Sequence, residues 1–383
     1  MLADALWARV QYQQDSIDST DVKHVLDGGA LLHRVLWQSG QTYIGVCNMY
    51  VDYVTQKYGK PLIVFDGYQQ GSSTKDVRHK RRTGLKMSPT IKFTEDMIIK
   101  SKKDFLSNKE NKERFIKLLR ERLEAAGCLT EQATGDADLL IVQRSVERAR
   151  SSTTVLVGDD TDLLVLLLYH ADITCKDIFF CPEPKQNSKK QRIWNINKTK
   201  SDLGDKVCKN ILFIHALLGC DTTSRLYGIG KGVALQKISN AQFSQQADVF
   251  SQSDPDEMEE IITAGEKALV CLYNGTLEDS LDSLRYKKFC NKVASSTTPV
   301  QACSLPPTTC AAKYHTLRVY HQIQVWKGVL GLHPDRWGWR QRGDKLEAIT
   351  TDQAAAPTYL LESLGVIAKL TVFPPIVLVR NTA

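Results

Sequence analysis

The sequence lacks the patterns of metal-finger, disulfide-rich and membrane-spanning proteins. Its ten cysteines include no Cys-x-x-Cys pair, so neither a zinc finger nor a disulfide framework is indicated, and reduced thiols are expected. No apolar run reaches the length of about 18 residues that a membrane span needs. The first residues carry an acid, Asp4, where a secretion signal would be basic and then apolar. We therefore expect an intracellular globular protein without internal repeats.

Positive charge is concentrated in one part of the chain. The net charge is +7, but residues 75–122 alone hold sixteen Lys or Arg against seven Asp or Glu. A solvated helix face or a localisation signal would explain such a stretch, but its position directly after an acidic strand end favours contact with phosphates. The densest part contains Lys75, Arg78, Lys80, Arg81 and Arg82.

The stretch Val155–Leu168 is the most informative in the sequence. A short β-branched run ends at Gly158, and Asp159, Asp160 and Asp162 follow before a second apolar run. In an open α/β sheet, ligands bind beyond the carboxyl ends of the strands, and Mg²⁺ prefers oxygen ligands there. The alternative is that these Asp residues only cap the next helix. Metal binding becomes the better interpretation only if other strand ends supply carboxylates too.

Other segments do supply them. Val22–Asp27 and Pro61–Asp66 both read as strands that end in Asp before glycine, although Asp27 could also be a simple helix N-cap. Asp136 and Asp138 lie in the first turn of a helix that we expect to run to about Arg150. The dipole of that helix favours an acid in its first turn, and this explains one Asp better than two.

Two further features follow the central stretch. Asp221 ends the run Leu218-Gly-Cys-Asp after a predicted helix. Gly228 and Gly230 then precede Lys231, and glycines spaced in this way at the start of a helix can hold a phosphate on backbone N–H groups. As a bare pattern these glycines indicate little more than a turn.

The rest of the chain gives coarser predictions. We expect helices over residues 42–58, 109–126, 257–273 and 313–326, a polar loop over 242–253 and a linker over 295–309. Trp337 and Trp339 could stack on bases, but a place in a core is favoured.

Taken together and in order, these motifs closely resemble the flap endonuclease and xeroderma pigmentosum G family of PIN-like nucleases. The resemblance covers roughly residues 20 to 240. It implies an α/β fold with a mostly parallel sheet flanked by helices, a basic helical arch at about 74–126, a helix–two-turn–helix and a mainly helical C-terminal extension. The stretches 65–68 and 219–223 also resemble PIN-like reading frames spread by mobile elements.

The resemblance also assigns roles to residues. Two Mg²⁺ or Mn²⁺ ions about 4 Å apart would generate hydroxide and stabilise the leaving oxygen. Seven carboxylates so close would need such cations to offset their repulsion. The implied metal ligands, which with Lys80 form the catalytic set, are Asp27, Asp66, Asp136, Asp138, Asp160, Asp162 and Asp221. The implied nucleic-acid contacts are Lys75, Arg78, Lys80, Arg81, Arg82, Gly228, Gly230 and Lys231, with a K⁺ ion at the glycine turn.

The sequence departs from the family pattern at three places. The family usually has Glu in its acid-x-acid pair, where this chain has Asp136 and Asp138. Its glycine-led N-terminal segment is absent here, and Asp221 is followed by two threonines and a serine in place of Tyr and an acid. These departures concern efficiency and flap specificity more than metal binding.

The sequence thus predicts a Mg²⁺-dependent, structure-selective endo- or exonuclease that acts on branched or single-stranded DNA, or on RNA, in the nucleus. A non-catalytic nucleic-acid-binding scaffold with the same fold is the chief alternative, and a nucleotidyl or glycosyl transferase is a third. All seven carboxylates are present, which favours the enzyme. The predicted domains are a nuclease core at 1–200, the helix–two-turn–helix with following helices at 201–295, and a C-terminal region at 296–383.

Overall fold

The computed structural model describes most of the chain. It covers residues 2–10, 17, 21–38, 40–67, 74, 88–183, 192–252, 254, 256–276, 278–295, 297–343 and 345–354. The predicted phosphate-contacting side chains of the basic stretch fall outside the described residues, and they are Lys75, Arg78, Lys80, Arg81 and Arg82.

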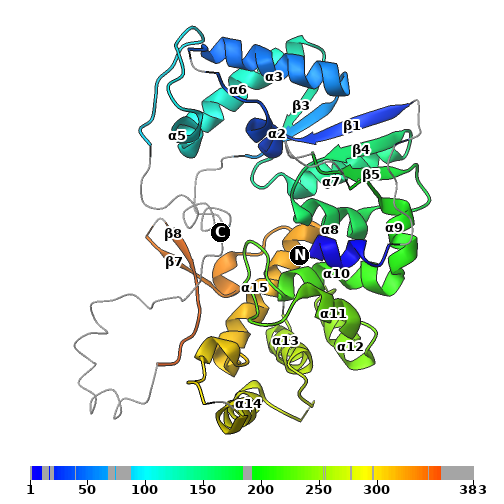
Figure 1. The fold of residues 1–383 in the computed structure, drawn as a ribbon, viewed down its shortest axis with the longest axis vertical. Coiled ribbons are helices and arrows are strands. Elements are labelled where there is room, and N and C mark those ends of the chain that lie inside the picture. Colours follow the sequence, from blue (N-terminus) through cyan, green and yellow to red (C-terminus); the bar gives the residue numbers. More distant parts are fainter. Residues whose placement is uncertain are drawn as a thin grey trace.

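A single six-stranded sheet, in the order β3-β2-β1-β4-β5-β6, organises the N-terminal half (Figure 1). The pairs from β3 to β5 are parallel, and only β6 runs antiparallel to its neighbour β5. The mostly parallel α/β sheet expected from the sequence is therefore confirmed. The strand bounds are β1 (Val22–Asp27), β2 (Leu62–Phe65), β3 (Leu129–Gln132), β4 (Thr153–Val157), β5 (Ile178–Cys181) and β6 (Trp194–Asn195).

The strands β2, β4 and β5 are buried on both faces, as parallel strands are when helices cover both sides of a sheet. Because side chains alternate along a strand, Val25 of β1 packs into one core cluster and Leu26 into the other. The same alternation separates Val64 from Phe65 in β2. The sheet therefore divides two apolar cores.

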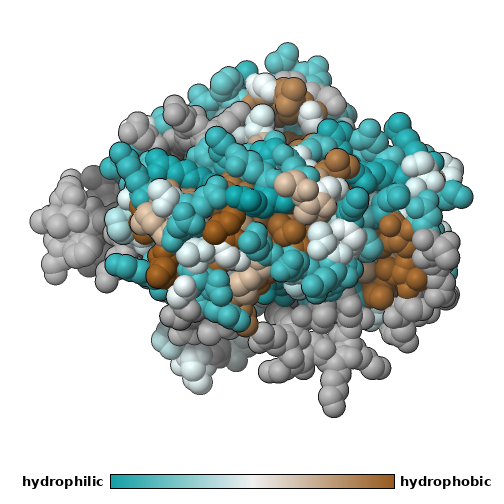
Figure 2. Space-filling model, turned by 90° about the horizontal axis from the view of Figure 1, so that it is seen from above, coloured by the Kyte–Doolittle hydropathy of each residue, from teal (hydrophilic) through white to brown (hydrophobic). Residues whose placement is uncertain are grey.

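One core lies under four helices, of which α3 and α6 are drawn above the sheet in Figure 1. Thr42 caps one of them and Gly59, at φ +70°, ends it, which confirms the helix predicted over 42–58. Seen from above in Figure 2, the surface is mainly hydrophilic, and polar side chains separate its apolar patches. The four helices are α2 (Gly28–Arg34), α3 (Tyr43–Tyr58), α5 (Lys102–Ser107) and α6 (Lys109–Ala125).

The second core is larger and continues away from the sheet into the helical lower part of Figure 1. Its central helix α10 is followed by a glycine-containing turn and then α11, as the predicted helix–two-turn–helix requires. The helices on this side are α1 (Leu2–Trp7), α7 (Asp138–Ala149), α8 (Thr161–His170), α9 (Ile196–Leu203), α10 (Asp205–Leu217), α11 (Lys231–Lys237), α12 (Ala241–Val249), α13 (Met258–Leu272), α14 (Leu281–Ser295) and α15 (Thr309–Lys327). No described helix has the length and apolar content that a membrane crossing requires.

The polar loop predicted over 242–253 is wrong, because the structure has helix α12 there. Asn240 caps the helix through Gln242 N and Phe243 N. Phe243, Ala247 and Phe250 recur at helical spacing and are buried, so packing outweighs the polar composition of the segment. The few apolar residues were correctly spaced for a helix.

The C-terminal helix α15 is part of the second core rather than a separate body. It packs against α10 and α13, and its Tyr320 stacks on Trp337 with ring centroids 4.7 Å apart. Trp337 and Trp339 are 1% and 3% exposed, which confirms the core interpretation of these tryptophans. They lie just before and at the start of the hairpin formed by β7 (Trp339–Arg342) and β8 (Lys345–Ala348). The domain boundaries given above stay a prediction.

The crossing of α13 and α15 depends on a glycine. A Cβ on Gly265 would overlap with the side chain of Thr316, which is fully buried on α15. We expect Gly265→Ala to destabilise the protein by about 2 kcal/mol, the usual cost of overpacking, and to lower the Tm by several degrees. Thr263→Ala, at an exposed position of the same helix, is the control. An unchanged Tm in Gly265→Ala would contradict the close packing of these helices.

Candidate metal and nucleic-acid site

The acidic residues predicted as a site lie at the carboxyl ends of three neighbouring parallel strands. Asp27 ends β1, Asp66 directly follows β2, and Asp160 follows β4 after Gly158 and Asp159. Since β2 and β4 flank β1 in the sheet, these positions meet at one edge. This is the edge at which α/β sheets bind ligands.

Asp27 and Asp66 converge above Gly29, at the start of α2. A Cβ on Gly29 would lie 3.1 Å from Asp27 Oδ1 and 3.6 Å from Asp66 Oδ2. The glycine therefore leaves open a small space that faces two carboxylate oxygens. Gly158 is required by packing, because a Cβ there would lie 2.6 Å from Leu163 Cδ1, and it brings the end of β4 to within 3.4 Å of Asp27 Cβ.

The N-cap interpretation of these residues is also confirmed. Asp27 Oδ1 accepts hydrogen bonds from Gly29 N at 2.8 Å and Ala30 N at 3.2 Å, and so caps α2. Asp160 Oδ1 accepts from Asp162 N at 3.1 Å and caps α8. The same Asp can cap a helix and belong to the site. The last carboxylate of a strand that leads into a helix lies both at the N-terminus of that helix and at the carboxyl edge of the sheet.

The acid-x-acid pair adjoins Asp66. Asp66 Oδ1 accepts a hydrogen bond from Ala137 N at 3.2 Å, between Asp136 and Asp138. Helix α7 begins at Asp138, so Asp136 lies just before the helix rather than in its first turn, and its Oδ1 accepts from Asp138 N at 3.2 Å. The start of α7 is thus tied to the end of β2.

Asp162 makes a contact that the sequence did not reveal. Its Oδ1 lies 2.6 Å from His215 Nε2, and His215 Nδ1 lies 2.6 Å from Lys231 Nζ. Burial lowers the pKa of Lys231 to about 8, although the charges of Asp162 and Asp160 act in the opposite direction. A lone histidine inside an apolar helix gave no signal in the sequence, because such residues are usually core residues.

Asp221 lies in the turn after α10, beyond Gly219 with its φ of +100° and Cys220. Burial raises the pKa of the Cys220 thiol, and the negative charge of nearby Asp162 raises it further. The turn that carries Asp221 therefore lies beside the start of α8.

The donor set fits a hard divalent cation only in part. Among the described residues, no three His, Cys, Asp or Glu side chains converge closely enough to hold an ion by themselves. Mg²⁺ commonly takes only one or two protein carboxylates and fills its shell with water and substrate phosphate. The all-oxygen pair above Gly29, with the space left by the missing Cβ, suits that type of binding.

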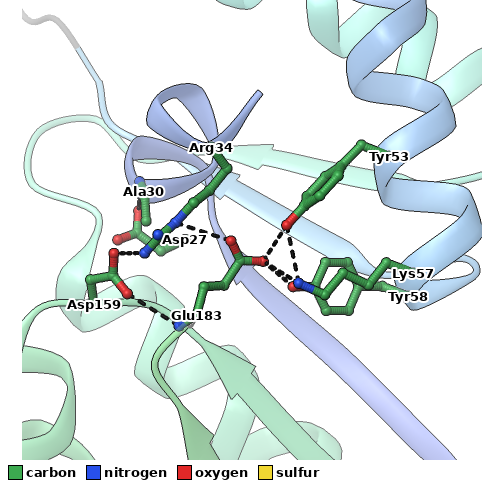
Figure 3. Close-up of polar contacts among 8 residues, drawn as sticks. All are labelled: Asp27, Ala30, Arg34, Tyr53, Lys57, Tyr58, Asp159 and Glu183. Atoms are coloured by element: carbon green, nitrogen blue, oxygen red, sulfur yellow. Dashed lines mark hydrogen bonds and ion pairs between the residues drawn. The ribbon is translucent and has the colours of Figure 1, made fainter. Parts of the chain in front are cut away.

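Asp159, the third carboxylate of the central stretch, belongs to a separate ion cluster (Figure 3). It pairs with Arg34 of α2 and accepts a hydrogen bond from Glu183 N at 3.2 Å. Arg34 Nε also lies 3.0 Å from Glu183 Oε2. This cluster ties α2, which Asp27 caps, to the ends of β4 and β5.

Glu183 is the centre of that cluster, and its side chain is 8% exposed. Tyr53 donates a hydrogen bond at 2.8 Å, Tyr58 donates another, and Lys57 Nζ lies 3.2 Å away. Burial disfavours the charged form of Glu183, but the two tyrosine hydroxyls and the lysine outweigh it, so its pKa lies below its ordinary value of 4.5. The sequence gave no sign of this role, because its partners are more than 120 positions away.

The glycine turn is only partly as predicted. Gly228 has a φ of +72°, which a glycine tolerates best, and a Cβ on Gly228 or Gly230 would meet nothing within 4 Å. The backbone there is open enough for a large ligand to approach. Lys231, predicted to contact nucleic acid, instead directs its ammonium at His215.

The space above Gly29 can be tested by filling it. We expect Gly29→Ala to weaken Mn²⁺ binding about tenfold or more, since the added methyl group would occupy the point that the carboxylates of Asp27 and Asp66 face. Isothermal titration with Mn²⁺ is the measurement. Gly135→Ala is the matched control, because a Cβ there meets nothing within 4 Å. Equal Mn²⁺ affinity in the two variants would exclude an ion above Gly29.

The Glu183 cluster predicts a pH dependence of stability. Because the folded-state pKa of Glu183 lies below 4.5, its carboxylate stabilises the fold above that pH, and the stabilisation is lost as the pH falls through the folded pKa. We expect Glu183→Gln to lower the free energy of unfolding at pH 7 by about 2 kcal/mol. Denaturant unfolding should show this difference shrinking below pH 4.5. A difference that grows towards acid would contradict the assignment.

Comparison with known proteins gives matches in structure only. No protein-family model matches the chain, and no curated protein matches it. The catalytic core of Rad2 in complex with DNA substrate matches with 15% identity and a TM-score of 0.40, over 85% of this chain and 94% of that one. Flap endonuclease-1 from Methanococcus jannaschii matches with 18% identity and a TM-score of 0.35, over 82% of this chain and 99% of that one.

A third match is the T5 D15 protein co-crystallised with metal ions, with 16% identity and a TM-score of 0.37, over 72% of this chain and 98% of that one. The solved structures that the chain resembles are thus nucleases of the flap endonuclease and xeroderma pigmentosum G family, the family that its sequence motifs also resemble.

Proposed function

We propose that this protein is a metal-dependent nuclease that hydrolyses phosphodiester bonds in DNA or RNA. The observation that carries the proposal is the convergence of Asp27 and Asp66 above Gly29, at the carboxyl edge of a parallel sheet. Two carboxylates from neighbouring strands facing one small space are costly unless a cation offsets their repulsion. A phosphodiester is the substrate class that combines with such a cation most directly.

Asp27 and Asp66 would hold the first Mg²⁺ or Mn²⁺ ion. Bound ions of this kind supply charge neutralisation at the phosphate and activation of the attacking water. The remaining acids are proposed as ligands of a second ion or as outer partners, and they are Asp136, Asp138, Asp160, Asp162 and Asp221.

The chain's own contribution is to orient these groups. Gly29 N and Ala30 N fix the Asp27 carboxylate by hydrogen bonds, and Ala137 N does the same for Asp66. Carboxylates held in this way lose little rotational freedom when they bind an ion or a substrate. The capping contacts therefore serve preorganisation as well as helix stability.

Two elements are proposed to bind the substrate, a basic stretch and a turn with an open backbone. The stretch 75–122 carries an excess of nine positive charges and directly follows the Asp66 strand end, so it is suited to steer phosphates towards the acids. The open backbone at Gly228 and Gly230 would contact a duplex backbone, with K⁺ as a bridging ion. A nuclear location is proposed on the same grounds.

A non-catalytic nucleic-acid-binding scaffold is the second candidate. One observation favours it: Asp27 and Asp160 cap helices, and Asp162 is bound by His215, so these acids would stabilise the fold even without an ion. Such a protein would keep its carboxylates for structural reasons alone.

Cleavage of a 5′-labelled flap and of a matching single strand separates the two candidates. We expect cutting with Mg²⁺ or Mn²⁺ and none with EDTA. Asp27→Asn and Asp66→Asn should each reduce the rate about 100-fold or more, because loss of outer partners alone costs 10–100-fold. Each change removes one negative charge that faces the proposed ion.

Asp172→Asn is the control for these variants, since Asp172 lies in the loop after α8 and its carboxylate accepts hydrogen bonds from Thr174 N and Oγ1, away from the proposed site. It should cut at the wild-type rate. Salt-sensitive binding without cutting under either metal would reject the nuclease and leave the scaffold. Asp160→Ala combined with Asp162→Ala extends the test to the β4 end.

A further inference from the structure

Three polar side chains, His215 buried and the other two half-buried, connect the acidic edge, which is formed by the carboxyl ends of β1, β2 and β4, to the glycine turn at Gly228 and Gly230. Asp162 lies in the first turn of α8, His215 near the end of α10, and Lys231 at the start of α11. The distances from Asp162 Oδ1 to His215 Nε2 and from His215 Nδ1 to Lys231 Nζ are both 2.6 Å. His215 is 3% exposed and Asp162 13%, so water competes little for these contacts.

The direction of each hydrogen bond follows from the donors available. A lysine ammonium can only donate, so Nδ1 of His215 must accept. The ring proton of neutral His215 is then on Nε2, from which it is donated to the Asp162 carboxylate. The imidazole also stacks on Trp326 of α15, with ring centroids 5.6 Å apart and planes at 27°, which fixes its rotation.

Lys231 stands where a lysine is otherwise unfavourable. It is the first residue of α11, and the positive end of a helix dipole repels a cation. Its ammonium is also largely withdrawn from water and lies near the charge of Arg225. Nearby negative charges on Asp160 and Asp162 offset this cost. Because this position disfavours a charged lysine, contact with a phosphate at the surface does not explain why Lys231 is there.

We propose that His215 and Lys231 are positioning residues that orient the carboxylate of Asp162 at the acidic edge. Lys231 thus acts through His215 and not through a nucleic-acid phosphate. The inference rests on the proposed function, in which Asp162 is a ligand or outer partner of an ion. It also means that the glycine turn and the acidic edge are in direct contact through side chains.

The test uses the full chain and two separate measurements. Mn²⁺ affinity is measured by isothermal titration, and binding of a labelled single strand is measured in EDTA by fluorescence anisotropy. The variants are His215→Leu, His215→Gln and Lys231→Met, each first checked for a cooperative thermal transition. Lys237→Met is the control, because Lys237 lies on the same helix but contacts Asn274 at 2.8 Å.

We expect His215→Leu to weaken Mn²⁺ binding about 10- to 100-fold, as loss of an outer partner does. His215→Gln should recover most of the affinity, since its amide can donate to Asp162. Lys231→Met should also weaken Mn²⁺ binding while leaving the strand affinity within about twofold of that of Lys237→Met. If His215→Leu unfolds, the comparison of His215→Gln with Lys231→Met decides.

Two outcomes would overturn the inference. One is wild-type Mn²⁺ affinity in both His215→Leu and Lys231→Met. The other is a large loss of strand binding in Lys231→Met with unchanged Mn²⁺ affinity, which would make Lys231 a phosphate contact. A wild-type protein that binds Mn²⁺ but cuts no strand would reject the nuclease, and the Mn²⁺ affinities of the variants would still decide this inference.

Discussion

Repulsion between carboxylates at the ends of parallel strands is the constraint on which the rest of this structure depends. Helix N-termini offset part of this repulsion, because Asp27, Asp66 and Asp160 all accept hydrogen bonds from backbone N–H groups where a helix begins. Each contact places an anion at the positive end of a dipole. Carboxylates that would otherwise push β1, β2 and β4 apart therefore help to fix the helices that begin at this edge, which are α2, α7 and α8.

Positive side chains also offset the repulsion between the carboxylates, and they lie at the margins of the acidic edge. Arg34 binds Asp159 and Glu183 on one side, and Lys231 reaches Asp162 through His215 on the other. Backbone N–H groups also hold the two carboxylates that face Gly29, because Gly29 N and Ala30 N donate to Asp27 and Ala137 N donates to Asp66.

The sequence predicted the strands and their terminal acids because both follow from local patterns. Val22–Asp27 alternates as a strand does and Leu62–Phe65 is a short apolar run, and at each an Asp precedes a glycine, so the sheet then brings Asp27 and Asp66 together without further information. The contacts of His215 with Asp162 and of Arg34 with Glu183 could not be predicted, since they join residues 53 and 149 positions apart and depend on tertiary packing. The prediction of a loop over 242–253 was wrong for a related reason, because the buried contacts of Phe243 outweighed the polar composition of the segment.

Gly29 is the position at which the cap of α2 and the proposed metal site meet. Its neighbour Gly28 is required by packing, because a Cβ there would overlap with the Phe65 ring. Gly29 has no such neighbour, since only the two carboxylates come near. A Cβ on Gly29 would lie 3.1 Å from Asp27 Oδ1, the oxygen that caps α2, so alanine there would crowd the helix cap as well as any ion bound beside it. The glycine therefore serves the cap and the proposed metal site together, and a substitution at this position affects both.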